Sequence, residues 1–471
     1  MSVPPSASVS CCRPTRRELF GLGVLLACLG LLHLVFRGLQ PEPRVWGDET
    51  HYWAFATQEA FEGRTGFLPG TFGFDHRPQL ATRVFAQFAD SRGIPAQPQE
   101  MVASAAKLVL RVGLFQIPLL LLALTAVYAT ARTLGLSSRG GLASVLFLGL
   151  LPQVGFHVHS LWPELLHLCL ASLGLLGLIF YLQAKRLYAL ALAGLALGLA
   201  LFSKGSLQVF LPLIPPALFL SAWRDEKFVA PDASLASRAR RGARSAIPAL
   251  VFLAPLALVL VPQILANARA GHGARLSANR WWNLELGLTL NTEDFKGEGA
   301  ARFEPLVEKS LAYFAAADQP AERERLARER TLRYVREHLP SVLWDQLEQT
   351  LQLFFFSESS LEQSLSFRGR WGATPPAWMN ALATFGRGLW FLMLAMALYG
   401  LHRAWSRPGW RLLSLFGLSF LAGLFLVSVK FRFLLPIVPV LCLFAGAGVE
   451  RLFSALGGRK VSDTVLGKSL R

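Results

Sequence analysis

Long apolar runs separated by short charged gaps dominate this chain. A helix needs about 20 apolar residues to cross the hydrocarbon core of a bilayer, and about ten runs of nearly that length can be marked. They lie at about 19–36, 110–131, 141–158, 161–182, 187–203, 205–222, 246–266, 383–402, 411–429 and 433–453. The pattern predicts an all-α polytopic membrane protein with about ten transmembrane helices.

The charged gaps predict how these helices cross the membrane. Cytoplasmic loops of membrane proteins hold an excess of Lys and Arg, and with the N-terminus inside every predicted cytoplasmic segment is basic. These segments contain Arg13, Arg16 and Arg17, Arg132 and Arg139, Lys185 and Arg186, the run from Arg224 to Arg244, Arg403, Arg407 and Arg411, and Arg451, Arg459 and Lys460. Two large segments, 37–109 and 267–382, are then predicted to face the outer side.

This assignment divides the chain into five parts. They are a cytoplasmic tail at 1–18, a transmembrane module at 19–266 with the outer loop 37–109, an outer, mostly helical region at 267–382, C-terminal transmembrane helices at 383–453 and a tail at 454–471. In the outer loop, an amphipathic spacing predicts a short helix from Asp48 to about Glu62, and "RPQLATRVFAQFADSRG" predicts a second. The outer region has helix-like runs at about 303–316 and 321–356.

Composition agrees with a membrane protein. Of the 471 residues, 53% are hydrophobic and 16% are charged, so a soluble core is implausible. The net charge of +17 is spread over the gaps as a topology signal, which argues against a nucleic acid partner. The five cysteines fall in the N-terminal tail or within apolar runs, so no disulfide framework is expected. The first run lacks a convincing cleavage site and is interpreted as an uncleaved span.

Several ionisable residues lie at the predicted outer ends of the spans, where they are costly and are functional candidates. They are Asp48, Glu49, Arg77, His157, His159, Glu164, Lys204, Lys430 and Arg432. Outer Lys and Arg oppose the topology rule, and an anionic ligand would explain them. Carboxylates can deprotonate a hydroxyl group or hold a divalent cation, while Arg and Lys stabilise a departing phosphate. The set fits group transfer from a phosphate-linked lipid.

Five motifs carry a family resemblance. "GDETHYWAFA" resembles the Asp-Glu-x-x-Tyr signature that follows the first span of GT-C fold glycosyltransferases, notably protein O-mannosyltransferases and lipid A aminoarabinose transferases. "FDHRPQLA" resembles their Lys-Pro-Pro-Leu element, "HSLWPELLHLCLASLGLL" their acidic residue at the start of the fourth span, and "GLALFSKGSLQVFLP" their Lys-Gly pair after the fifth. The late "KFRFLLPIVPVLCLFAGAG" is similar to their arginine-leading span. Arg77 and Gln79 depart from the second element, which puts its local turn in doubt but keeps a cation.

The resemblance implies roles for individual residues. Asp48 would be the general base that activates the acceptor, Glu49 would act beside it or orient the loop, and Glu164 would be a further catalytic carboxylate. Tyr52, Arg77, Lys204 and Arg432 would bind substrate, the cations through the lipid phosphate. If Asp48 and Glu164 converge, they could share a proton or hold a divalent cation, which is the one cofactor left open.

Most of these residues also have an interpretation that assigns them no catalytic or binding role. Asp48, Glu49 and Glu164 could stabilise helix N-termini, the last of them beside Pro163. Lys204 and Lys430 could reach the outer headgroups. The two histidines at 157 and 159 are interpreted as interfacial polar residues, and Trp53, Trp281 and Trp282 as aromatic belt residues outside the site.

The sequence therefore predicts a multi-pass glycosyltransferase of the bacterial inner membrane, with its active site facing the periplasm. Its expected partners are a polyprenyl-phosphate-sugar donor carrying a hexose or pentose, membrane lipids, and a lipid, polysaccharide or protein acceptor. No Gly-rich phosphate loop points to a nucleotide donor. The alternatives are a transporter or flippase of an anionic lipid-linked substrate, for which neither broken spans nor repeated halves are apparent, and a noncatalytic scaffold.

Overall fold

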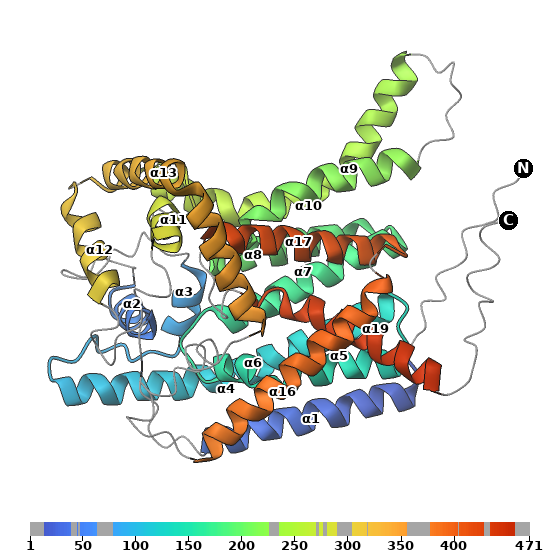
Figure 1. The fold of residues 1–471 in the computed structure, drawn as a ribbon, viewed down its shortest axis with the longest axis horizontal. Helices are drawn as coiled ribbons and strands as arrows, with labels where there is room; N and C mark the ends of the chain where they lie inside the picture. Colours follow the sequence, from blue (N-terminus) through green and yellow to red (C-terminus); the bar gives the residue numbers. More distant parts are fainter. Residues whose placement is uncertain are drawn as a thin grey trace, which may run out of the picture.

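The computed structural model describes most of the chain as helices. The described residues are 14–38, 45, 48–63, 79–225, 235–269, 273–276, 280–289, 304–317, 319–355, 377–403, 405–427 and 434–456, and all regular elements within them are helical (Figure 1). Within this part, seven helices are long and apolar enough to cross a membrane, or up to eight if one bent pair forms a single span. The protein is an integral membrane protein.

Each apolar run marked in the sequence overlaps one to three helical elements. They are α1 (Arg16–Gly38), α4 (Pro98–Thr133), α5 (Ser138–Leu150) with α6 (Pro152–Val158), α7 (Glu164–Ala184), α8 (Leu187–Ser203), α9 (Ile214–Asp225) after the 3-10 turns η2 (Gly205–Val209) and η3 (Leu211–Leu213), α10 (Leu235–Arg269), α16 (Ala377–Gly400), α17 (Pro408–Val427) and α19 (Val438–Leu456). The all-α prediction is confirmed, and the number of ten spans stays a prediction.

The third predicted span, 141–158, is not one straight helix. Its two parts, α5 and α6, meet at an angle of 62°. Pro152 opens α6, and Leu151 before it has an extended backbone with φ −66° and ψ 113°. A residue before proline is disfavoured from the helical conformation, and proline has no N–H to continue the ladder of hydrogen bonds. Such a bend is typical of a broken span or of a re-entrant loop, and it was not recognised in the sequence.

Helix α4 begins at Pro98, inside the predicted outer loop, and about one-third of its 36 residues precede the apolar run. The two predicted amphipathic helices are present as α2 (Asp48–Glu62) and α3 (Leu80–Ala86). An apolar cluster joins them to the early part of α4 and to the α6–α7 turn, and its buried members include Trp53, Phe85, Leu108 and Trp162. This packing fixes α2 against the bundle.

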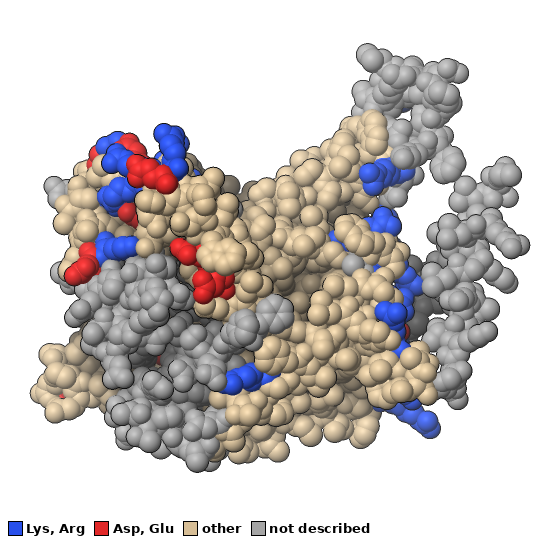
Figure 2. All heavy atoms as spheres, viewed as in Figure 1, with Lys and Arg blue, Asp and Glu red and all other residues tan. Residues whose placement is uncertain are grey.

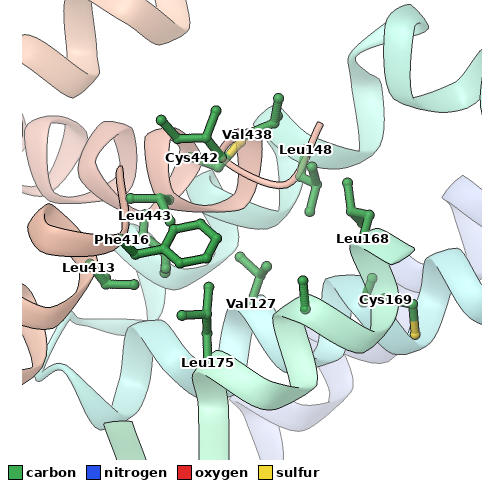
Figure 3. Close-up of a cluster of buried hydrophobic side chains, with 14 of the residues drawn as sticks. Val127, Leu148, Leu168, Cys169, Leu175, Leu413, Phe416, Val438, Cys442 and Leu443 are labelled. Atoms are coloured by element: carbon green, nitrogen blue, oxygen red, sulfur yellow. The ribbon is translucent and has the colours of Figure 1, made fainter. Parts of the chain in front are cut away.

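The main core lies where the helices of both halves of the chain meet. Figure 3 shows side chains from α4, α5, α7, α17 and α19 directed toward one another, among them Val127, Leu148, Leu175 and Phe416. Phe416 is fully buried, and its ring packs edge-on against Phe210, with 4.6 Å between the centroids. Residues from before 220 and after 410 thus share one interior.

A smaller helical unit consists of α11 (Arg280–Thr289), α12 (Glu304–Ala315) and α13 (Pro320–Phe355). The rings of Trp282 and Tyr313 stack at its centre, and buried Glu324 accepts hydrogen bonds from the Tyr313 hydroxyl and from the Trp281 and Trp282 N–H groups. Burial, followed by the nearby Glu324 charge, raises the pKa of Tyr313 above its ordinary value. The helical runs predicted at 303–316 and 321–356 correspond to α12 and α13.

The two ends of the bundle differ in charge. One end, which we call the basic end, joins the start of α1, the α4–α5 turn, the α16–α17 connection and the end of α19. Arg132 lies 3.5 Å from Glu18, and Glu450 accepts the Ser137 N–H at 2.6 Å and lies 3.9 Å from Arg403. Figure 2 shows Lys and Arg gathered along this end. Acidic and basic side chains are mixed over α12 and α13, at the opposite end of the same view. The other end, which carries α2 and α3, is called the α2–α3 end.

Candidate active site

The candidate site is built around the turn between α6 and α7, residues 159–163. Three helices bind this turn with polar side chains. The Leu161 N–H donates to Glu49 Oε1 at 2.8 Å, Gln116 Nε2 donates to the Ser160 carbonyl at 2.6 Å, and His33 Nδ1 lies 3.3 Å from His159 Nε2. These partners come from α2, α4 and α1 respectively. A turn held in this way presents the first residue of α7 in one position.

That first residue, Glu164, forms a buried ion pair with Lys204. Lys204 Nζ lies 2.7 Å from Glu164 Oε1, and the two side chains are 15% and 3% exposed. Ion pairs of this kind keep both groups charged at a depth where either charge alone would be very costly. The α6–α7 turn and the end of α8 are therefore linked at the α2–α3 end by one charged contact.

The backbone after α8 explains why Lys204 projects toward α7. The helix ends at Ser203, and Lys204 takes an extended conformation with φ −156° and ψ 130° before the 3-10 turn η2 begins at Gly205. The Lys204 N–H still donates to the Ala200 carbonyl at 2.9 Å. Because the helical path stops here, the Lys204 side chain can turn across to Glu164 instead of following the surface of α8.

Asp48 is the first residue of α2, and its neighbour Glu49 ties this helix end to the α6–α7 turn. The Glu49 carboxylate is fully buried, and its contact at Leu161 lies three residues before Glu164. The start of α2 and the start of α7 are thereby brought together, as the predicted convergence of Asp48 and Glu164 requires. The structure describes the backbone of Asp48 within the helix but not its side chain.

Tyr52 lies one turn along α2 from Asp48 and is 5% exposed. Its ring packs edge-on against Phe85 of α3, with 6.3 Å between the centroids. Two further predicted site residues, Arg77 and Arg432, lie outside the described residues. Whether these three side chains bind substrate stays a prediction, and the packing of Tyr52 shows a second role in holding α3 against α2.

The two histidines predicted as interfacial are buried inside the protein. His157 is fully buried and contacts the rings of Phe156 and Trp162, and His159 is 3% exposed in its contact with His33. Whether the turn lies at the membrane interface stays a prediction, and the structure shows that protein side chains enclose both rings. In the structure α1, α2 and α4 cover the turn on several sides.

Sequence reasoning missed four polar residues around this site. His33 and Gln116 hold the turn. His167 and Ser206, which are close in sequence to Glu164 and Lys204, form a hydrogen bond of 2.9 Å. The signal for His33 and Gln116 was a single polar residue inside an apolar run. The signal for His167 was its place three residues after Glu164, on the same face of α7.

The donor set for a metal ion is limited. Among the residues that the structure describes, no group of three or more His, Cys, Asp or Glu side chains could hold one. The Asp48 side chain lies outside this set, so a divalent cation between Asp48 and Glu164 stays a prediction. With Glu164 already paired with Lys204, the described groups favour charge compensation by the ammonium group.

Comparison with solved structures identifies the fold. The oligosaccharyltransferase AglB from Archaeoglobus fulgidus, in complex with an inhibitory peptide and a dolichol-phosphate, aligns over 97% of this chain and 53% of its own, with a TM-score of 0.51 and 15% identity. The chain has the GT-C glycosyltransferase fold. This chain spans about half the length of the archaeal protein. A structure of an Archaeoglobus fulgidus oligosaccharyltransferase in the apo form aligns over 94% of this chain and 52% of its own, with a TM-score of 0.51 and 15% identity.

Two weaker structural likenesses and one sequence match accompany the GT-C fold. The S. cerevisiae protein O-mannosyltransferase Pmt1-Pmt2 complex bound to the sugar donor aligns over 56% of this chain and 36% of its own, at 20% identity and a TM-score of 0.42. ArnT from Cupriavidus metallidurans bound to undecaprenyl phosphate aligns over 93% of this chain and 79% of its own, at 15% identity and a TM-score of 0.38. Residues 106–239 match the family described as dolichyl-phosphate-mannose-protein mannosyltransferase, and this stretch includes Glu164 and Lys204. No curated protein sequence matches the chain.

Proposed function

We propose that this GT-C fold protein is a membrane glycosyltransferase that moves a sugar from a polyprenyl monophosphate to an acceptor hydroxyl or amine. One observation carries the proposal. The Glu49 hydrogen bond to Leu161 sets the acidic start of α2 beside the turn from which Glu164 reaches Lys204. A base and a cation for phosphate are the two groups that this transfer needs.

In the proposed reaction, Asp48 takes the proton of the acceptor oxygen or nitrogen as that atom attacks the anomeric carbon of the sugar. The bond between this carbon and the phosphate oxygen breaks, and the polyprenyl phosphate leaves with the electron pair. Attack opposite to the leaving group inverts the configuration at the sugar carbon.

Lys204 is proposed to stabilise the departing phosphate, and Glu164 to hold its ammonium group in place before the donor binds. A preoriented cation needs little reorganisation as negative charge develops, which is the main source of this kind of catalysis. Arg77 and Arg432 are proposed as further phosphate contacts, and Tyr52 as a contact to the sugar. Glu49 acts through the backbone of the α6–α7 turn and is proposed as a positioning residue.

We further propose that the α2–α3 end faces the periplasm of a bacterial inner membrane and that the basic end faces the cytoplasm. The basic end gathers the charges that cytoplasmic loops retain. The donor headgroup would then reach the site from the periplasmic leaflet, with its tail among the lipids. The sequence family matched by residues 106–239 and the dolichol-phosphate bound by the archaeal relative support a lipid-phosphate donor.

The test is the release of free polyprenyl phosphate from a radiolabelled polyprenyl-phosphate sugar by the purified protein in lipid, with an envelope extract as acceptor. Release should require the extract and should fall by about a hundredfold or more in Asp48→Asn, as expected for loss of a catalytic base. Glu62→Gln, at the other end of the same helix, is the matched control and should retain activity. Full activity in Asp48→Asn with normal expression would remove the base assignment.

The bend between α5 and α6 gives a specific reason to test a transporter as the second candidate. Transporters place substrate sites at broken spans, and this break lies on the path from α5 to the α6–α7 turn. A transporter relocates the lipid-linked sugar without consuming it. Movement of intact donor across the bilayer, with no release of lipid phosphate, would favour transport over transfer.

A further inference from the structure

We infer that His167 and Ser206 are positioning residues that hold the backbone around Lys204, so that α7 controls this lysine at two points. Glu164 contacts the Lys204 side chain, and His167, three residues later on the same helix, contacts the chain on either side of it. The inference rests on the proposed function for its catalytic meaning, because Lys204 is the proposed phosphate contact.

The hydrogen bonds of His167 fix the tautomer of its neutral ring. Its Nδ1 lies 2.8 Å from the Ala200 carbonyl oxygen, and its Nε2 lies 2.9 Å from Ser206 Oγ. A carbonyl oxygen can only accept, so Nδ1 must carry the proton. In the neutral ring Nε2 is then the acceptor, and the Ser206 hydroxyl donates to it. Both ring nitrogens are satisfied, in a side chain that is 1% exposed.

These two contacts lie before and after Lys204, where the helical path is interrupted. The Ala200 carbonyl belongs to the last turn of α8 and also accepts the Lys204 N–H. Ser206 belongs to η2, the 3-10 turn that follows. A single imidazole therefore ties the end of one helix to the start of the next, across the extended residue that carries the ammonium group.

We call the two contacts of His167, with Ala200 and Ser206, the His167 clamp. The position of His167 on α7 couples this clamp to the ion pair of Glu164 and Lys204. Residues three apart lie on the same face of a helix, so Glu164 and His167 face the end of α8 together. If the clamp opens, the Lys204 backbone is free to leave its extended conformation, and the ammonium group loses its alignment with Glu164. His167 thus acts through Lys204 and makes no contact with substrate.

The first experiment measures the position of Lys204 without any need for activity. The full-length protein in lipid nanodiscs is treated with an amine-reactive acylating reagent, and the labelling rate of Lys204 is measured by mass spectrometry relative to exposed Lys107. Loss of one hydrogen bond should raise this ratio about fivefold in Ser206→Ala and in His167→Asn, which keeps a donor near Ala200 but loses the acceptor for Ser206.

Two control variants match these changes. Ser172→Ala removes a buried hydroxyl from the same helix α7, where it donates to the Leu168 carbonyl. His402→Asn alters an imidazole that also has Nδ1 near a backbone carbonyl, at the basic end. Both should leave the labelling ratio unchanged. An unchanged ratio in Ser206→Ala and His167→Asn as well would overturn the inference.

The second experiment asks whether the clamp acts through Lys204 in sugar transfer. Ser206→Ala should lower kcat about fivefold, while in a Lys204→Met background it should cause no further loss. Losses that multiply in the double variant would overturn the inference and leave the transferase assignment standing. If the wild-type protein releases no lipid phosphate, the proposed function fails, and the labelling ratio still decides whether His167 positions Lys204.

Discussion

Glu49 and Glu164, near the candidate site, have different roles because their carboxylate oxygens contact different groups. Glu49 Oε1 accepts a backbone N–H from the α6–α7 turn, whereas Glu164 Oε1 meets the Lys204 ammonium group. The first contact requires an acceptor oxygen but no negative charge. The second requires the charge itself, since without it a buried ammonium group would remain. Substitution by glutamine should therefore separate the two.

For Glu49 we expect glutamine to be tolerated and alanine to be harmful. Glu49→Gln keeps an oxygen for the Leu161 N–H, so thermal stability and transfer should stay near wild type. Glu49→Ala leaves a buried donor without its acceptor, which costs about 1–3 kcal/mol. Thermal unfolding in detergent, followed by Trp fluorescence, measures this cost. Complete loss of transfer in a stable Glu49→Gln protein would instead make Glu49 a catalytic residue.

For the ion pair of Glu164 and Lys204 we expect a second substitution to restore thermal stability without restoring sugar transfer. Lys204→Met leaves Glu164 buried without the ammonium group and should cost about 3–5 kcal/mol of stability. Adding Glu164→Gln should restore most of that stability, because the remaining groups are neutral. Transfer should stay at least about a hundredfold below wild type in both proteins, as expected for a lost phosphate contact. Lys107→Met, on an exposed face of α4, is the control.

The sequence was informative about charged residues and uninformative about their neutral supports. Glu164 and Lys204 could be predicted because an ionisable group at a span end is costly and needs a reason. His33 could not be assigned a role, because its partner His159 lies 126 residues away and nothing local in an apolar run indicates that contact. Long-range hydrogen bonds depend on which helices pack together, and a single sequence does not show this.

At the scale of helices, glycines decide where α5, α16 and α19 cross. A Cβ atom at Gly446 of α19 would collide with Ser144 and with the Gly140 carbonyl of α5. On the other side of α19, a Cβ atom at Gly448 would collide with the Met396 carbonyl of α16. Membrane helices associate closely where small residues let their backbones approach. Helix α19 therefore packs closely against α5 on one side and α16 on the other.

We predict that Gly446→Val separates α19 from α5 and destabilises the protein by about 1–3 kcal/mol or more, because backbone atoms cannot move aside as a side chain can. Gly388→Val in α16 is the matched control, since a Cβ atom there has no neighbour within 4 Å. The two variants are compared by thermal unfolding and by the monodisperse fraction on size exclusion. Equal stability of the two would show that the crossing tolerates a side chain.

The helices themselves could be predicted from apolar length, since a span needs a run of about 20 residues. The bend at Leu151 was also readable in principle, because Pro152 disfavours a helical residue before it. The early start of α4 was not, because residues 98–109 are only partly apolar and their burial depends on α2 and α3. Helix ends outside the apolar runs are set by tertiary contacts.

The molecule as a whole has two chemically different ends. At the basic end, the start of α1, the α4–α5 turn, the α16–α17 connection and the end of α19 meet through Arg132, Arg403 and Glu450. At the other end lie α2, α3 and the unit of α11 to α13 (Figure 1). This separation of charge is the basis for the proposed orientation, and labelling can test it directly.

Two cysteine substitutions report the orientation. In a protein without its five native cysteines, Glu62→Cys at the end of α2 should react with an impermeant maleimide in spheroplasts. His402→Cys in η6 (Leu401–Arg403) should react only after the membrane is disrupted, because the proposed orientation puts it in the cytoplasm. The reverse pattern would invert the protein and remove the periplasmic active site.

The central place of α19 has a consequence for how the protein is made. Among the described helices, α19 is the last to be synthesised. It packs between α5 and α16, and more than half of its apolar residues are buried inside the protein. A ribosome must therefore translate past residue 456 before α5 and α16 gain α19 as their partner. Until then the groove beside Gly140 and Ser144 stays open to lipid, and a chain terminated early would reach the membrane as an incomplete bundle suited to proteolysis.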